Sequence, residues 1–212
     1  RFPPVDNWEE LRKQANEAVM PAALAAGEAV TLVDVATIPN VKIENVYVGV
    51  DNIFGAPLYT VNKLYLGSKA VEALTKVQER LASKGYGLVV WDAYRPWAVS
   101  KLAHLALPAD KKYMLEDPDL KGNKHNTGNA VDVSLYDLET GESIEMSSGF
   151  DEPSMRQYAS YPGGTERQRY LRTMLRETME EFGFTGIEME WWHFEYDIQG
   201  SYAHQNIPLN NL

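Results

Sequence analysis

Four segments of the chain show the pattern of apolar and polar residues that is typical of an amphipathic helix. The clearest begins at Ser68 and ends in Lys84 and Gly85, a basic last turn followed by the glycine that often closes a helix. Another follows Pro96, because proline suits the first turn of a helix. The pattern predicts helices over residues 7–26, 68–84, 97–107 and 166–182.

Short runs of apolar and β-branched residues lie between these helices, as expected of strands. Residues 87–91 read Gly-Leu-Val-Val-Trp, which is typical of a buried strand, and residues 129–135 alternate apolar and polar side chains. The order of the elements indicates an α+β fold, in which helices pack against a largely antiparallel central sheet. The predicted strands are residues 29–35, 46–50, 87–91, 129–135 and 188–196.

Length and composition limit the number of domains and the kinds of partner that the chain can have. A chain of 212 residues, 44% of them hydrophobic, suits a single domain over 1–212, with an amino-terminal helix at about 7–26 and a core at about 30–205. No apolar run approaches the roughly 18 residues of a membrane span. Thirty acidic residues against twenty basic ones give a net charge of −10, which disfavours nucleic acid as a partner. These features leave the oligomeric state open.

The side chains available for chemistry are few. The chain has no cysteine, which excludes disulfides, thiolate nucleophiles and cysteine-type zinc sites. Any metal or acid–base chemistry must therefore draw on thirty carboxylates and four histidines. The histidines are His104, His125, His193 and His204.

The first candidate group is His125 with Asp132. Gly128 lies between them and allows the backbone to turn, so that the imidazole can approach the carboxylate. Within the predicted strand, Asp132 points away from the face of its valine neighbours. The two side chains could thus converge on one cation. The alternative is that Asp132 caps a turn and His125 is an exposed loop residue, and the segment alone fits both.

The second candidate group is Glu190 with His193, inside an aromatic segment. A histidine there is more often a core residue, but a catalytic zinc needs three protein ligands and one open position. His125, Asp132 and His193 would form that set, with Glu190 as the base that takes a proton from water. In an ideal strand, residues three apart face opposite sides. Glu190 must therefore lie before the strand or at a bulge.

The third candidate is Arg95, at a junction between a predicted strand and a predicted helix. A guanidinium beside a metal can stabilise the oxyanion that forms when water attacks a carbonyl. The alternative is an ordinary surface arginine near a helix start. We expect His104, within the helix over 97–107, and His204, in the tail, to take no part in the site.

Together these segments resemble the zinc D-alanyl-D-alanine dipeptidases, metallopeptidases related to zinc D,D-carboxypeptidases and to the Hedgehog amino-terminal fold. The family pattern is Ser-x-His-x-x-Gly-x-Ala-x-Asp, a later Glu-x-x-His and an upstream Tyr-Arg-Pro. Here residues 123–132 read Asn-Lys-His-Asn-Thr-Gly-Asn-Ala-Val-Asp, residues 190–193 read Glu-Trp-Trp-His and residues 94–96 read Tyr-Arg-Pro. Residues 51–59 also resemble an early substrate-side segment, so the resemblance covers most of residues 30–205.

The resemblance implies a role for each matching residue. It implies that His125, Asp132 and His193 bind one catalytic zinc ion, that Glu190 is the general base and acid, and that Arg95 stabilises the transition state.

It also implies substrate contacts at two further positions. Asp151 resembles the aspartate that receives the free ammonium group of the substrate in this family. Asn123 stands where the family usually has serine, which leaves the preference for a dipeptide over longer peptides open.

The resemblance thus implies zinc-dependent hydrolysis of the small dipeptide D-Ala-D-Ala to two D-alanines. One alternative is a zinc D,D- or L,D-carboxypeptidase acting on peptidoglycan stem peptides, and another is a non-catalytic binding module that contains zinc. We expect a periplasmic or cell-envelope location, with the cytoplasm as the alternative. A chain without cysteine suits an oxidising compartment but does not require one.

Overall fold

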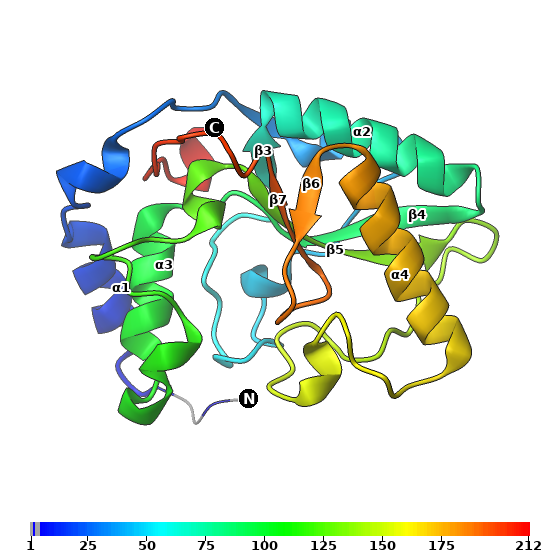
Figure 1. The fold of residues 1–212 in the computed structure, drawn as a ribbon. Coiled ribbons are helices and arrows are strands. Elements are labelled where there is room, and N and C mark those ends of the chain that lie inside the picture. Colours follow the sequence, from blue (N-terminus) through cyan, green and yellow to red (C-terminus); the bar gives the residue numbers. More distant parts are fainter. Residues whose placement is uncertain (1, 3–4) are drawn as a thin grey trace.

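The computed structural model describes residue 2 and residues 5–212. Four α-helices and seven β-strands form its framework (Figure 1). The helices are α1 (Trp8–Glu17), α2 (Ser68–Ala82), α3 (Trp97–Ala106) and α4 (Glu166–Glu181). The strands are β1 (Leu32–Asp34), β2 (Lys42–Ile43), β3 (Tyr65–Gly67), β4 (Tyr86–Asp92), β5 (Ala130–Asp137), β6 (Phe184–Gly186) and β7 (His193–Tyr196).

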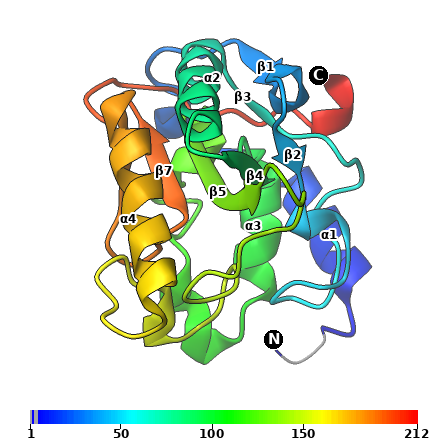
Figure 2. The ribbon, with the colours of Figure 1, turned by 90° about the vertical axis from the view of Figure 1, so that its right-hand side faces the viewer.

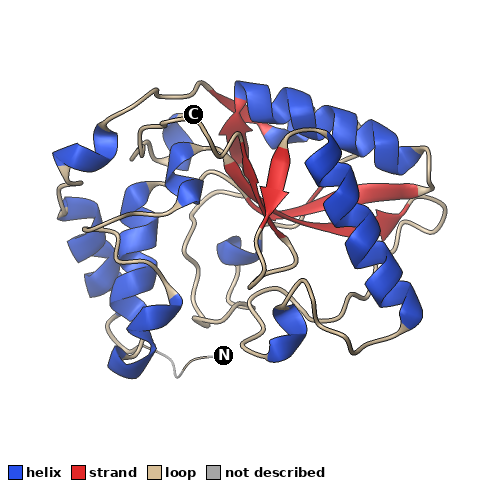
Figure 3. Cartoon of the chain, in the orientation of Figure 1, coloured by secondary structure: helices blue, strands red, loops and turns tan. Residues whose placement is uncertain are grey.

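The central sheet has five strands in the order β2-β4-β5-β7-β6. The strands, drawn in red in Figure 3, lie between the helices. The edge strand β2 pairs with β4 in parallel, and the other three pairings are antiparallel. Strands β1 and β3 form a separate antiparallel pair. The prediction of an α+β fold with a largely antiparallel central sheet is therefore confirmed.

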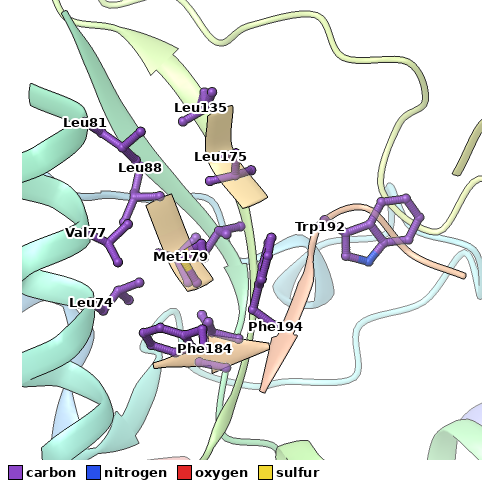
Figure 4. Packing of buried hydrophobic residues seen from close by; sticks show 14 of the residues in the cluster. Leu74, Val77, Leu81, Leu88, Leu135, Leu175, Met179, Phe184, Trp192 and Phe194 are labelled. Carbon is purple, nitrogen blue, oxygen red and sulfur yellow. The ribbon is translucent and has the colours of Figure 1, made fainter. Parts of the chain in front are cut away.

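Helices α2 and α4 lie on one side of the sheet and α1 and α3 on the other (Figures 1 and 2). The core beneath α2 and α4 forms because α2 turns Leu74, Val77 and Leu81 toward the sheet, where they join Leu88 of β4 and Leu135 of β5 (Figure 4). All five side chains are fully buried. Each such side chain stabilises the fold by roughly 1.5–3 kcal/mol relative to exposure.

A second cluster of buried residues lies around α1 and α3. It includes Trp8 of α1, Leu102 of α3 and the rings of Tyr47 and Tyr59. Phe150 packs against both clusters. The loop that contains Phe150 is therefore held between the two halves of the core.

Several predicted elements differ from the structure. The helix expected over 7–26 ends at Glu17, because a residue before a proline disfavours helical geometry and Pro21 follows shortly; Ala22–Ala25 is only a 3₁₀ turn. The strand expected over 46–50 is wrong. Val46–Val48 forms a 3₁₀ turn, since the Asn45 side chain accepts a hydrogen bond from the Tyr47 backbone N–H.

The other elements match more closely. Helices α2, α3 and α4 and strands β4 and β5 begin and end within about two residues of their predicted bounds. The strand expected over 29–35 is shorter, and the last strand begins at His193 rather than at residue 188. The short strands β2, β3 and β6 were not predicted. Within residue 2 and residues 5–212, no helix has the length and apolar character needed to cross a membrane.

Candidate active site

Three polar side chains stand in a row across neighbouring strands. Asp132 of β5 is paired with Asp92 of β4 on one side and with His193 of β7 on the other. The register of β4 shifts between Val90, which pairs with Val133, and Asp92, which pairs with Asp132, so Trp91 is an extra residue in a β-bulge. The bulge places Asp92 on the same face as Asp132, whereas Val90 stays on the core face.

His125 reaches this row from a 3₁₀ turn, Lys124–Thr127, that precedes β5. The turn ends at Gly128, whose φ is +80°, and a Cβ there would lie 2.7 Å from Leu32 Cδ2. Nδ1 of His125 lies 2.6 Å from the Ala93 carbonyl oxygen and must donate to it, because a carbonyl can only accept. The backbone thus engages Nδ1, and the other ring nitrogen, Nε2, lies 3.3 Å from Asp132 Oδ2. His125 is buried, so the alternative of an exposed loop residue is wrong.

His193 meets the same carboxylate from the other side. Its Nδ1 lies 2.9 Å from Asp132 Oδ1, and its Nε2 lies 3.5 Å from Glu195 Oε1. Burial lowers the pKa of His193, but the contacts with Asp132 and Glu195 outweigh burial and raise the pKa to about 10. Burial likewise opposes ionisation of Asp132, yet the two histidines hold its pKa well below the usual range.

These three side chains could hold a metal ion. One ligand atom from each of His125, Asp132 and His193 lies within 4.8 Å of the others, and all three residues are buried. His193 Nδ1 lies 2.9 Å from Asp132 Oδ1 and His125 Nε2 lies 3.3 Å from Asp132 Oδ2, so each imidazole faces one oxygen of the carboxylate. Two imidazole nitrogens and one carboxylate are a donor set suited to zinc and leave a position open.

Glu190 stands just before β7, as the spacing of the sequence requires. The His193 backbone N–H donates to the Glu190 carbonyl oxygen at 3.3 Å, which forms a turn at the start of the strand. The Glu190 side chain is partly exposed. Burial and, second, the negative charge of Asp132 raise its pKa. A raised pKa makes the carboxylate a better proton acceptor.

Arg95 is buried rather than on the surface. Its Nε and Nη2 donate to Asp92 Oδ2 at 3.0 and 2.6 Å. The Tyr59 hydroxyl donates to the other oxygen of Asp92 at 2.7 Å, and the guanidinium lies 5.4 Å from the centre of the Tyr47 ring. Asp92 thus fixes the arginine. Sequence reasoning missed Asp92.

Asp151 is also tied to this network. The Tyr47 hydroxyl donates to Asp151 Oδ2 at 2.5 Å, so one tyrosine contacts both Asp151 and Arg95. Burial raises the pKa of Asp151 to about 7, although the Tyr47 hydrogen bond acts in the opposite direction. Its φ of +53° is uncommon for a residue other than glycine and marks a strained backbone.

The remaining histidines and Asn123 are placed differently. His104 and His204 lie outside the metal-binding group found in the described part of the chain. Asn123 begins the turn that carries His125, and its backbone N–H donates to Asn126 Oδ1 at 3.0 Å. Asn123 Oδ1 is buried and has no hydrogen-bond partner within the described residues.

Residues 28–209 match the M15 peptidase family described as D-ala-D-ala dipeptidase. This range includes every residue of the site. The chain belongs to this family of metallopeptidases.

Named relatives agree with this membership. The D-alanyl-D-alanine dipeptidase of Escherichia coli (strain K12) is 37% identical over 172 residues, which cover 81% of this chain and 87% of the relative. The protein of the same name from Enterococcus faecalis (strain ATCC 700802 / V583) is 37% identical over 163 residues, covering 68% and 80%. The one from Enterococcus faecium is 33% identical over 161 residues, with the same coverage.

A solved structure is more distant. The LdcB LD-carboxypeptidase has 19% sequence identity and a TM-score of 0.46, and the match covers 78% of this chain and 67% of that one. A likeness at this level says nothing about function. Membership of the family rests on the sequence matches.

Proposed function

We propose that this protein is a zinc-dependent dipeptidase that hydrolyses D-alanyl-D-alanine to two molecules of D-alanine. The observation that carries the proposal is the His125, Asp132 and His193 group, with the raised-pKa carboxylate of Glu190 at the start of the strand that bears His193. The substrate in this proposal, D-alanyl-D-alanine, is taken from the names of the relatives. A structural metal site would need neither an open ligand position nor a neighbouring acid–base carboxylate.

Zinc would be held by His125 Nε2, His193 Nδ1 and the Asp132 carboxylate. When bound, zinc supplies a Lewis acid that polarises the scissile carbonyl and makes water more acidic. His125 presents Nε2 to the site, because the Ala93 carbonyl engages its Nδ1.

Glu190 carries the proton through the reaction. As the water oxygen bonds to the carbonyl carbon, the Glu190 carboxylate takes one of its protons. The carboxylic acid then gives this proton to the peptide nitrogen while the carbon–nitrogen bond breaks, and the second D-alanine leaves as an amine. One residue thus acts as base and then as acid, for which a pKa above that of an ordinary glutamate is suited.

Arg95 stabilises the negative oxygen that develops in the tetrahedral intermediate. The guanidinium is buried and its direction is fixed by two hydrogen bonds to Asp92, so little reorganisation is needed when charge develops. Nη1 takes no part in the two hydrogen bonds to Asp92.

Asp151 would receive the substrate's ammonium group. Tyr47 occupies one of its oxygens and leaves the other to the ligand. An ammonium group beside the carboxylate favours its charged form, which burial alone disfavours. A longer peptide has an amide in place of the ammonium and would leave this carboxylate without a charged partner, so the site would select a free dipeptide.

The test is a hydrolysis assay with the metal content measured in parallel. We expect D-alanine release from D-Ala-D-Ala by the zinc-loaded protein, its loss on chelation and its return on zinc addition. N-acetyl-D-Ala-D-Ala and a pentapeptide that ends in D-Ala-D-Ala should be much poorer substrates. Faster cleavage of the pentapeptide would identify a carboxypeptidase instead. Stoichiometric zinc without cleavage of any of these peptides would indicate a binding module.

A further inference from the structure

His193 lies between two carboxylates, one at each nitrogen of its ring. Nδ1 lies 2.9 Å from Asp132 and Nε2 lies 3.5 Å from Glu195. Asp132 is one of the proposed metal ligands, whereas Glu195 is outside the group that could hold the ion. When His193 is neutral and Nε2 carries its proton toward Glu195, Nδ1 has the free lone pair that a cation needs.

The strand explains why Glu195 reaches His193. Residues two apart in β7 project from the same face, so the two side chains are neighbours. The residue opposite Glu195 in β5 is Ala130, whose small side chain leaves room beside the carboxylate. The side chains of His193 and Glu195 are 9% and 21% exposed, so water only partly weakens the interaction between them.

The other imidazole is held in a different way. His125 Nδ1 donates to a backbone carbonyl, that of Ala93, which is neutral and independent of any side chain. The two histidines thus have different partners behind them, a carbonyl for His125 and a carboxylate for His193. A negative charge behind an imidazole makes it a stronger donor to a metal and also fixes its tautomer.

The geometry points to Glu195 as a positioning residue of the metal site, which orients His193 with Nδ1 toward the ion and strengthens metal binding. This inference rests on the proposed function, because it requires that the group binds zinc. Glu195 contacts His193 and acts through it. Partners of this kind typically change metal affinity by about 10- to 100-fold.

The first experiment measures zinc affinity by competition with a chromophoric chelator. We expect Glu195→Leu, which lacks both charge and acceptor, to weaken zinc binding by about 10- to 100-fold. Glu195→Gln keeps an acceptor oxygen but no charge, so its zinc affinity should fall by a smaller factor. Glu177→Gln, which removes an exposed carboxylate from α4, is the control for net charge and should bind zinc as the wild type does.

The second experiment reads the ring of His193 directly, by two-bond ¹H–¹⁵N spectra of the zinc-loaded protein. In the wild type we expect Nδ1 to be bound to the metal and Nε2 to carry a slowly exchanging proton. In Glu195→Gln we expect the signal of the His193 Nε2 proton to shift upfield. In Glu195→Leu we expect the same shift and, in addition, faster exchange of this proton with water. A variant that only folds less well would not give this graded change in the Nε2 proton signal.

The outcomes separate the two proposals. If the wild type binds zinc but both Glu195 variants bind it within twofold of the wild type, the inference about Glu195 falls and the proposed function stands. If His193 binds zinc through Nε2, the inference also falls. If the wild type binds no zinc, the proposed function falls and the inference falls with it.

Discussion

Asp92 and Asp132 lie opposite each other on β4 and β5 because β4 contains one extra residue, Trp91, at a bulge. Without this bulge, Asp92 would keep the alternation of β4 and share the core face of Val90. With it, Asp92 joins the face of the metal group and holds Arg95 through two hydrogen bonds. A local irregularity in one strand thus brings the arginine and the proposed metal ligands together.

The Asp92–Arg95 ion pair predicts a loss of activity when the charge of Asp92 is removed. Asp92→Asn keeps the shape of the side chain but leaves the buried guanidinium without its counter-charge, which typically costs about 3–5 kcal/mol when a buried pair is broken. We expect kcat to fall by about 10- to 100-fold, while zinc content is unchanged. Steady-state kinetics and metal analysis test this.

A double-mutant cycle with Arg95→Ala provides the control for Asp92→Asn. If Asp92 acts by fixing Arg95, the effects of the two substitutions on kcat will not add. Additive losses would show that Asp92 acts independently of the arginine.

The acid–base role predicts that Glu190→Gln nearly abolishes hydrolysis without loss of metal. General acid–base catalysis is worth about 10²–10⁴-fold, and Glu190 would serve in two steps. We expect kcat to fall by at least about 10³-fold, with unchanged zinc stoichiometry. Near-normal turnover of D-Ala-D-Ala by this variant would contradict the role.

The raised pKa of Asp151 predicts how stability depends on pH. Its carboxyl ionises near pH 7 in the folded protein, against 3.8 as its ordinary value. Between these values the folded state binds more protons than the unfolded state, so the contribution of Asp151 to stability declines as pH rises from about 4 to about 7. Asp151→Asn has no carboxyl to ionise and avoids this loss.

We therefore expect Asp151→Asn, in metal-free protein, to be more stable than the wild type at pH 8 by on the order of 1–3 kcal/mol, with a smaller difference at pH 5. Urea unfolding at both pH values measures this. The same variant should raise KM for D-Ala-D-Ala by about 30-fold or more, because a charge pair with the ammonium is lost. A KM equal to that of the wild type would exclude contact between Asp151 and the substrate.

Metal removal should destabilise the fold. His125 and Asp132 lie before and in β5, and His193 lies in β7, so an ion bound by all three joins these segments. A ligand present at about 1,000 times its Kd stabilises the folded state by roughly 4 kcal/mol. We expect Tm to fall on chelation and to rise with added zinc, as measured by calorimetry. A Tm independent of zinc would show that the ion does not bind the folded protein.

Gly128 offers a test of backbone geometry. Gly128→Ala would force a Cβ into a conformation with φ of +80° and within 3 Å of the side chains of Leu32 and Val30. We expect a loss of about 1–3 kcal/mol in stability and weaker zinc binding, since His125 would move. Gly85→Ala is a matched control, because its φ is +86° but no atom lies within 4 Å of the added Cβ.

The sequence predicted those parts of the fold that depend on local patterns. Helix α4 was predictable because its residues follow a helical pattern that Gly183 closes. The turn at Val46–Val48 was not, because its composition is that of a strand and only the Asn45 hydrogen bond decides against one. Strand β2 has two residues, too few for any pattern.

The site shows the same division. His125, Asp132, His193 and Glu190 were singled out by their match to the family pattern, and the structure brings the first three together. Asp92 was missed because its direction depends on the bulge, which is a pairing between two strands and is invisible in either one alone. Tyr47 was missed because it lies in the segment misinterpreted as a strand.

The row formed by Asp132 and His193 makes metal binding sensitive to strand register. A slip of one residue between β5 and β7 would turn one of the two side chains toward the opposite face, where α2 and α4 form the hydrophobic core. Such a misfolded chain could retain most of its helices and yet could not assemble the three ligands. Zinc uptake during refolding would therefore report the moment at which the central strands reach their native alignment.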